Sequence, residues 1–222
     1  MSIPAGVTVF CDPTLRPAFA ALDGMGGLQV AALCAPAPLM LAQITRHTRD
    51  DVLFTLSTAM DQAVAAKLVR LETRVDGFCN TLVLAGLADR TTPPPSRALL
   101  AALLAVARVA VTDATIASGL DGRAVLAGNN LMAPRLLGGA NTGDVAFLVT
   151  TGAADLGLMY MTDVKADPRL AVIATLNADP KLTNYAAAVN AKAVSPNALS
   201  FLNSLRGPAA ATLRAAGLTV PA

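Results

Sequence analysis

The 222-residue sequence has no tryptophan, two tyrosines and one histidine. So few aromatic rings exclude the stacking surfaces of carbohydrate-binding proteins and the aromatic cages that hold organic cations. One histidine and three scattered cysteines argue against a zinc or haem site, because such sites need several nitrogen or sulfur ligands together. We therefore predict neither a metal centre nor a bound cofactor.

Charge is also scarce. Charged residues make up 14% of the chain and the formal net charge is +2, which does not provide the basic footprint of a nucleic-acid-binding protein. Apolar residues reach 54%, so a disordered chain is excluded. The longest apolar run, residues 98–107, is much shorter than the ~20 residues of a membrane-spanning helix. We expect a folded, monomeric chain.

The first residues lack the basic region of a signal peptide and lead directly into a strand pattern. We expect a periplasmic protein if a signal peptide has been removed, and a cytoplasmic one otherwise. Cys11, Cys34 and Cys79 have no metal-ligand spacing, and each lies in or beside an apolar run. We interpret them as small buried thiols. A disulfide between Cys11 and Cys34 is the alternative if their segments are neighbouring strands.

Short strands alternate with helices along the chain. Strands are predicted at residues 7–10, 28–34, 52–55, 81–84, 108–111, 156–159, 170–175 and 185–189. Helices are predicted at 15–22, 39–45, 59–68, after a Ser96 cap, at 120–126, 145–149, 195–207 with Ser195 as N-cap, and 209–216. This alternation predicts an α/β protein whose parallel sheets are covered on both faces.

Catalytic motifs are missing: the sequence has neither a glycine-rich phosphate loop nor a nucleophile elbow. We interpret His47 as a solvated loop residue and Asp50-Asp51 as a surface turn. If the protein were an enzyme, its reactive groups would have to be Asp12, Cys11 and Tyr160. The side chains of sequence neighbours such as Cys11 and Asp12 point apart in extended backbone, which is poor geometry for a catalytic pair. We therefore predict a protein that is not an enzyme.

Hydroxyl residues recur where a strand leads into a helix. Thr14 follows the first strand, Ser118 follows the strand at 108–111, and Thr142 precedes the helix at 145–149. Each of them alone is explained by ordinary N-capping. Together they indicate a ligand site, because strand-to-helix junctions of parallel sheets gather at the carboxyl edge. Helix N-termini with hydroxyls bind anions without Lys or Arg.

Several segments carry a resemblance in collinear order. They are Val-Thr-Val-Phe at 7–10, Asp-Val-Leu-Phe-Thr at 51–55, Asn-Thr-Leu-Val-Leu at 80–84, Ala-Val-Thr-Asp at 110–113 with Ala-Ser-Gly at 117–119, Gly-Leu-Met-Tyr at 157–160, Asn-Tyr at 184–185 and Gly-Pro-Ala-Ala at 207–210. With them, nearly the whole chain resembles the molybdate-binding proteins of bacterial ABC importers, which are type II periplasmic binding proteins.

The resemblance implies two Rossmann-like lobes around a ligand cleft. Lobe one would comprise residues 1–81 and 187–222, and lobe two residues 82–186, joined near 80–84 and 185–189. Hinge closure on molybdate or tungstate, and presentation to an ABC permease in the membrane, are the implied function. The alternative is a binding or sensor protein of this fold for another small ligand, such as an organic acid, without a transporter.

The resemblance also implies ligand contacts from Thr14, Ser118, Thr142 and Tyr160, with Asn141 beside Thr142. Two departures lie in lobe one.

Where the family has a serine-rich stretch, this chain has Cys-Ala-Pro-Ala-Pro at 34–38, so Ala37 offers no hydroxyl and two N–H donors are lost. Asp12 would repel a dianion by roughly 1–4 kcal/mol at ~4 Å, unless it caps the helix at Thr14 and turns away from the cavity.

Overall fold

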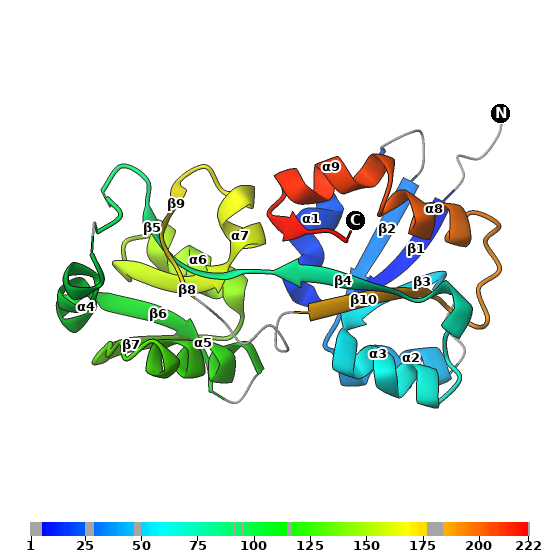
Figure 1. Cartoon of the computed structure of the whole chain (residues 1–222), viewed down its shortest axis with the longest axis horizontal. Helices are drawn as coiled ribbons and strands as arrows, with labels where there is room; N and C mark the ends of the chain where they lie inside the picture. Colours follow the sequence, from blue (N-terminus) through cyan, green and yellow to red (C-terminus); the bar gives the residue numbers. More distant parts are fainter. Residues whose placement is uncertain are drawn as a thin grey trace. The chain divides into compact units, whose positions relative to one another are not determined.

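A computed structural model describes residues 6–24, 29–46, 50–90, 92–94, 96–114, 117–176 and 184–221. Internal contacts divide the chain into two compact units (Figure 1). Unit 1 comprises Met1–Cys79 and Thr183–Ala222, and unit 2 comprises Asn80–Leu182. Within the ranges just given, no helix has the length and hydrophobicity to cross a lipid bilayer.

Unit 1 is built on a six-stranded sheet in the order β11-β4-β10-β3-β1-β2. Its strands are β1 (Gly6–Cys11), β2 (Gln29–Cys34), β3 (Val52–Leu56), β4 (Val75–Asn80), β10 (Asn184–Val189) and β11 (Leu218–Thr219). β1 pairs in parallel with both β2 and β3, whereas β10 runs antiparallel to β3 and β4. The expectation of purely parallel sheets is therefore wrong at β10.

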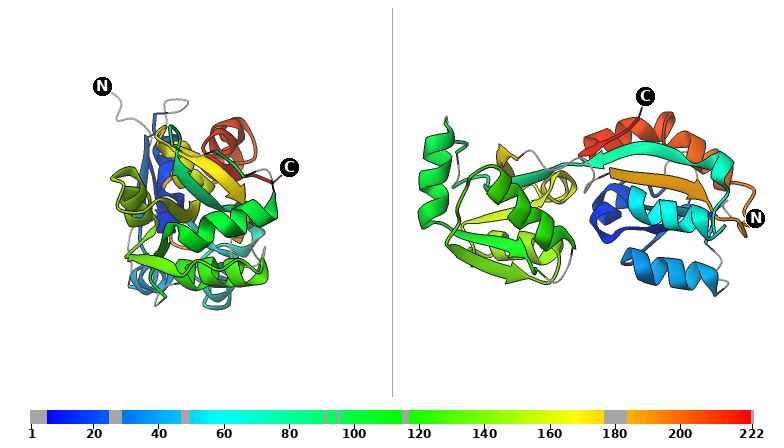
Figure 2. Two further views of the ribbon diagram at one scale, coloured as in Figure 1. Left: turned by 90° about the vertical axis from the view of Figure 1, so that its left-hand side faces the viewer. Right: turned by 60° about the horizontal axis from the view of Figure 1, so that its bottom comes forward.

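Helices cover both faces of this sheet (Figures 1 and 2). They are η1 (Pro13–Leu15), α1 (Arg16–Ala20), α2 (Ala37–Thr45), α3 (Ser57–Ala65), η3 (Leu71–Thr73), α8 (Ala198–Ser204) and α9 (Pro208–Ala215). Alternate residues of β1 point to opposite faces, so Val9 packs with Phe19 of α1, while Phe10 packs with Met40 and Met60 of α2 and α3. The central strands β1, β3 and β10 are mostly apolar because both of their faces are buried.

Unit 2 has a five-stranded sheet in the order β7-β6-β8-β5-β9. Its strands are β5 (Leu82–Leu87), β6 (Arg108–Thr112), β7 (Arg135–Gly139), β8 (Leu156–Tyr160) and β9 (Leu170–Thr175). β6 is parallel to β7 and β8, but β5 is antiparallel to β8 and β9. The helices are α4 (Arg97–Val106), α5 (Ala117–Gly128), α6 (Thr142–Thr150) and α7 (Met161–Ala166). Ser96 caps α4 as predicted, accepting a hydrogen bond from the Leu99 backbone.

Five of the described elements were not predicted: η3, β4, β7, α7 and β11. β7 carries two glycines and lies at the edge of its sheet, so its own residues give a weak strand signal. The prediction that Ser195 is the N-cap of a helix is also wrong. α8 begins only at Ala198, after Asn197, and the Ser195 hydroxyl accepts a hydrogen bond from the Asn197 N–H before the helix starts.

Asp50 and Asp51 do not form a surface turn, because they are only 2% and 7% exposed. The Asp50 carboxylate accepts a hydrogen bond of 2.7 Å from the buried Asn190 side chain. The Asp51 carboxylate accepts one from the Thr8 N–H at 2.9 Å and one from the Ser195 N–H at 3.2 Å. The hydrogen bonds of Asp50 and Asp51 therefore link the amino end of β3 to the neighbouring β1 and to the segment after β10.

Candidate functional site

The carboxyl ends of β1, β2 and β3 lie at one edge of the unit 1 sheet, because these strands are parallel. β10 starts at this edge, with Tyr185 opposite Leu56 in register. The loop into η1 follows β1, and α3 begins at Ser57 directly after β3. Hydroxyl residues from three segments distant in sequence, Thr14, Ser57 and Tyr185, are therefore placed at this edge.

Asp12, Thr14 and Tyr185 form a hydrogen-bonded chain at this edge. The Asp12 carboxylate accepts from the Thr14 N–H at 3.1 Å and from the Thr14 hydroxyl at 2.7 Å. The Tyr185 and Thr14 hydroxyl oxygens lie 2.8 Å apart. Since the single hydroxyl proton of Thr14 goes to Asp12, the Tyr185 hydroxyl is the donor in the second bond.

Asp12 is the N-cap of η1, which was one of the two interpretations of this residue. Burial raises the pKa of its carboxyl group, and the two hydrogen bonds from Thr14 act in the opposite direction. Sequence reasoning treated Tyr185 only as part of a strand. Its contact with Thr14 joins residues 171 positions apart, and no local pattern encodes such a contact.

The start of α2 is poor in donors. Pro36 is its N-cap and a second proline stands in its first turn, so two N–H groups are missing there. The N–H groups of Leu39 and Met40 point back to the Pro36 carbonyl. Ala37 packs its methyl group against the core between α2 and α3.

Unit 2 has a corresponding edge, where β6, β7 and β8 end at Thr112, Gly139 and Tyr160. α5, α6 and α7 begin just after these strands. Tyr160 is 3% exposed, pairs in register with Leu82 and packs into the core beneath α4 and α5. The side chain of Ser118, in the first turn of α5, lies outside the described residues, as does His47.

The side chains of Asn141 and Asp144 both cap the first turn of α6. The Asn141 side chain accepts from the Asp144 N–H at 3.0 Å, and the Asp144 carboxylate accepts from the Ala140 N–H at 3.0 Å. Thr142 is buried, and its hydroxyl donates to the Asp163 carboxylate. The predicted pair Asn141 and Thr142 therefore lies at the amino end of a nine-residue helix.

Asp163 lies in α7, and its hydrogen bond with Thr142 links this helix to α6. The Asp163 carboxylate also accepts a hydrogen bond from the Tyr160 N–H at 3.1 Å. Burial raises the pKa of Asp163 to about 6, against the hydrogen bonds from Tyr160 and Thr142, which lower it. The carboxylate is therefore held beside two of the predicted ligand residues, Thr142 and Tyr160.

The raised pKa of Asp163 predicts a pH-dependent stability. An unfolded aspartate titrates near 3.8, so between about pH 4 and 6 the folded chain holds a proton that the unfolded chain releases. The stabilisation is complete below pH 4 and is lost as the pH rises to about 6. Relative to Asp163→Asn, the wild type should lose roughly 2 kcal/mol of unfolding free energy between pH 4 and 7. Urea unfolding of both proteins, followed by circular dichroism, measures this. A difference that stays constant with pH would contradict the assignment.

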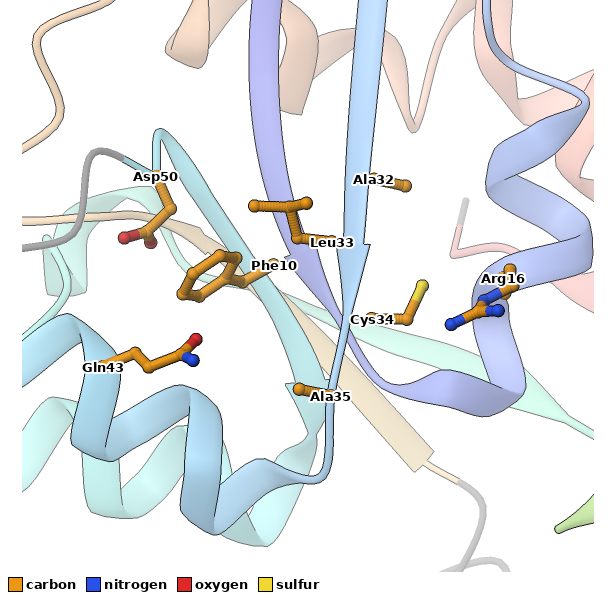
Figure 3. A pocket seen from close by; sticks show the side chains of 8 residues that line it. All are labelled: Phe10, Arg16, Ala32, Leu33, Cys34, Ala35, Gln43 and Asp50. Atoms are coloured by element: carbon orange, nitrogen blue, oxygen red, sulfur yellow. The ribbon is translucent and has the colours of Figure 1, made fainter.

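A cavity of about 650 Å³ lies elsewhere in unit 1, around the edge strand β2. Figure 3 shows Arg16 and Cys34 on one side of this strand and Phe10, Gln43 and Asp50 on the other. The remaining lining residues are Ala32, Leu33 and Ala35. Asp12, Thr14 and Ala37 do not line this cavity, so it differs from the predicted oxyanion site.

Among the residues that the structure describes, no group of three or more His, Cys, Asp or Glu side chains is placed to hold a metal ion. The polar groups at the two edges include hydroxyls, backbone N–H groups, the Asn141 amide and the carboxylates of Asp12, Asp144 and Asp163. The Arg123 guanidinium also lies at the unit 2 edge, where it donates to the Thr112 carbonyl. Such groups can hold a small polar ligand through hydrogen bonds.

Comparison with known proteins identifies the architecture. The sequence model of a family described as bacterial extracellular solute-binding protein matches residues 7–219. No curated protein matches the sequence.

Among solved structures, the substrate-binding domain of a molybdenum ABC transporter from Clostridium difficile superposes with a TM-score of 0.76 at 19% identity, over 98% of this chain and 99% of that one. The periplasmic molybdate-binding protein of Azotobacter vinelandii gives 0.75 at 18% identity, over 97% and 100%. The sulfate-binding protein of Mycobacterium tuberculosis gives 0.69 at 14% identity, over 97% and 87%. These similarities confirm the predicted fold, that of the periplasmic binding proteins.

Proposed function

Because the chain belongs to the bacterial extracellular solute-binding proteins, we propose that it captures a small oxyanion by hinge closure and delivers it to an ABC importer. Molybdate or tungstate is the first candidate. Periplasmic location, a permease partner and a monomeric state are parts of the same proposal. The family and the structural neighbours are binding proteins, so no chemical step is assigned.

One observation carries the proposal: each unit gathers hydroxyls and helix amino ends at the carboxyl edge of its parallel strands. In unit 2, Thr142 opens α6, and α5 begins at the end of β6. In unit 1, Thr14 and Tyr185 are hydrogen-bonded together beside η1. Unpaired N–H groups at helix amino ends and neutral hydroxyl donors stabilise an anion without a Lys or Arg partner.

Unit 1 supports a second candidate, a small organic or protonated acid. The Thr14 hydroxyl proton is already donated to Asp12, as that of Thr142 is to Asp163, so a fully ionised oxyanion must compete with a carboxylate for each of them. α2 also begins with two prolines in its cap and first turn, which weakens its supply of N–H donors. A ligand with an O–H group of its own can instead donate to Asp12.

The test is thermal unfolding in the presence of candidate ligands. Because a ligand that binds only the folded state stabilises it, molybdate or tungstate at about 100 times Kd should add about 2.7 kcal/mol. That corresponds to an increase of several degrees in Tm for a chain of this size. No increase with either oxyanion at millimolar concentration would overturn the first candidate. An increase with small organic acids alone would support the second.

Two threonines at opposite ends of α6 provide a matched control. Thr142→Val removes the hydroxyl at the amino end, and Thr151→Val makes the same change at the exposed carboxyl end. The ligand-induced increase in Tm should shrink in the first variant and persist in the second. Tyr160→Phe tests a second predicted hydroxyl of unit 2 in the same assay. If both Thr142→Val and Tyr160→Phe respond as the wild type does, the site assignment in unit 2 is wrong.

A further inference from the structure

Cys11 and Cys34 lie side by side on neighbouring strands. They are partners in the parallel register of β1 and β2, and their sulfur atoms are 2.7 Å apart. Strands that pair in a sheet are ~4.8 Å apart, which falls within the ~4.4–6.8 Å between Cα atoms that a disulfide spans. Both thiols are free in this structure, but the paired strands place them within reach of a disulfide bond.

The two thiols differ in access. Cys11 is fully buried, with 0% exposure, among the core residues of unit 1. Cys34 is half-buried and lines the cavity around β2 (Figure 3). A reagent that enters this cavity meets the Cys34 sulfur, whereas Cys11 has no exposed surface and does not line the cavity.

The electrostatics favour Cys34 as the reactive thiol. Its sulfur accepts hydrogen bonds from the Cys11 thiol and from the guanidinium of Arg16, and together they lower the pKa of Cys34 to about 7. The same pairing, together with burial, raises the pKa of Cys11. Because the thiolate is the nucleophile in disulfide exchange, attack starts from Cys34.

We propose that Cys11 and Cys34 form a reversible dithiol–disulfide site that exchanges with low-molecular-weight disulfides entering the cavity around β2. The Cys34 thiolate attacks one sulfur of a disulfide R–S–S–R, forms Cys34–S–S–R and releases RS⁻. Cys11 then loses its proton and attacks the Cys34 sulfur, which forms the Cys11–Cys34 bond and expels the second RS⁻. Two protein thiols are oxidised, R–S–S–R is reduced, and the two protons end on two RSH molecules.

This reaction changes the charge of the cavity. Oxidation removes the Cys34 thiolate and leaves the Arg16 guanidinium without that partner. Extracellular compartments are oxidising, so a protein of this family meets disulfides there. The inference is independent of the oxyanion proposal, because neither cysteine belongs to the predicted ligand set.

The test uses the reduced full-length protein and excess oxidised glutathione, with free thiols counted after denaturation and intact mass measured. The wild type should fall from three free thiols to one, lose two hydrogens in mass and recover on reduction with dithiothreitol. Cys79→Ser is the matched control and should fall from two to none at the same rate. Retention of all three wild-type thiols, or a lasting glutathione adduct on Cys34, would overturn the proposal.

Two variants distinguish Cys34, the thiol that attacks the small disulfide, from Cys11, the thiol that then closes the protein disulfide. Cys11→Ser should stop at the mixed disulfide of Cys34 with glutathione, and Cys34→Ser should leave Cys11 unreacted. Peptide mapping of the native wild type after brief iodoacetamide treatment gives the same information without a substitution. Cys34 should be alkylated well before Cys11; equal labelling of the two would contradict the assigned order of attack.

Discussion

Replacing Gly157 with valine is expected to destabilise unit 2 by about 3 kcal/mol. Gly157 lies within β8, and a Cβ atom there would come within 2.8 Å of Val145, 2.9 Å of Val149 and 2.9 Å of Met159. Val145 and Val149 belong to α6 and are fully buried, so they have no free space to retreat into. A side chain at position 157 must therefore push α6 away from the sheet.

The same displacement would move the amino end of α6, where Thr142 lies. Gly157→Ala should have a smaller effect of the same kind, and Gly128→Ala is the control, because nothing lies within 4 Å of a Cβ at that exposed position. Thermal and urea unfolding of the three variants measure the difference. If Gly157→Val unfolded at the wild-type midpoint, the close packing of α6 on β8 would be wrong.

Asp51→Ala is expected to cost about 3 kcal/mol of unfolding free energy. The two carboxylate oxygens of Asp51 each accept a different backbone N–H, one from Thr8 and one from Ser195. Removing the carboxylate leaves both donors without this acceptor in a site where Asp51 is 7% exposed. Buried donors that lose their partner cost more than the hydrogen bond itself contributed.

Asp51→Asn separates the effect of the two hydrogen bonds from the effect of losing side-chain volume, because asparagine has nearly the same size as aspartate. The amide keeps one acceptor oxygen but presents an NH₂ group to the other N–H, so we expect a loss that is smaller than for alanine and clearly above zero. Asp89→Ala is the control, since the Asp89 side chain is 77% exposed. Denaturant unfolding that ranks Asp51→Ala together with Asp89→Ala would refute the buried role of Asp51.

Misreading Asp50 and Asp51 as a surface turn shows where local patterns fail. Two consecutive acidic residues are usually solvated, because burial of a charge needs a partner. Here the partners are Thr8 and Asn190, which lie 43 and 140 positions away from the carboxylates they meet. The Thr14–Tyr185 contact has the same origin, so Tyr185 joined the candidate site only in the folded chain.

The sequence by itself determined the α/β class, strands such as β1 and β8 and the Ser96 cap of α4, because periodicity and capping act within a few residues. It also carried the family resemblance, whereas the ligand contacts of Thr14, Ser118, Thr142 and Tyr160 stay predictions. Only the tertiary structure decided the antiparallel strands β5 and β10 and the pairing of Cys11 with Cys34. The physical reason is that strand order and register depend on packing between segments distant in sequence.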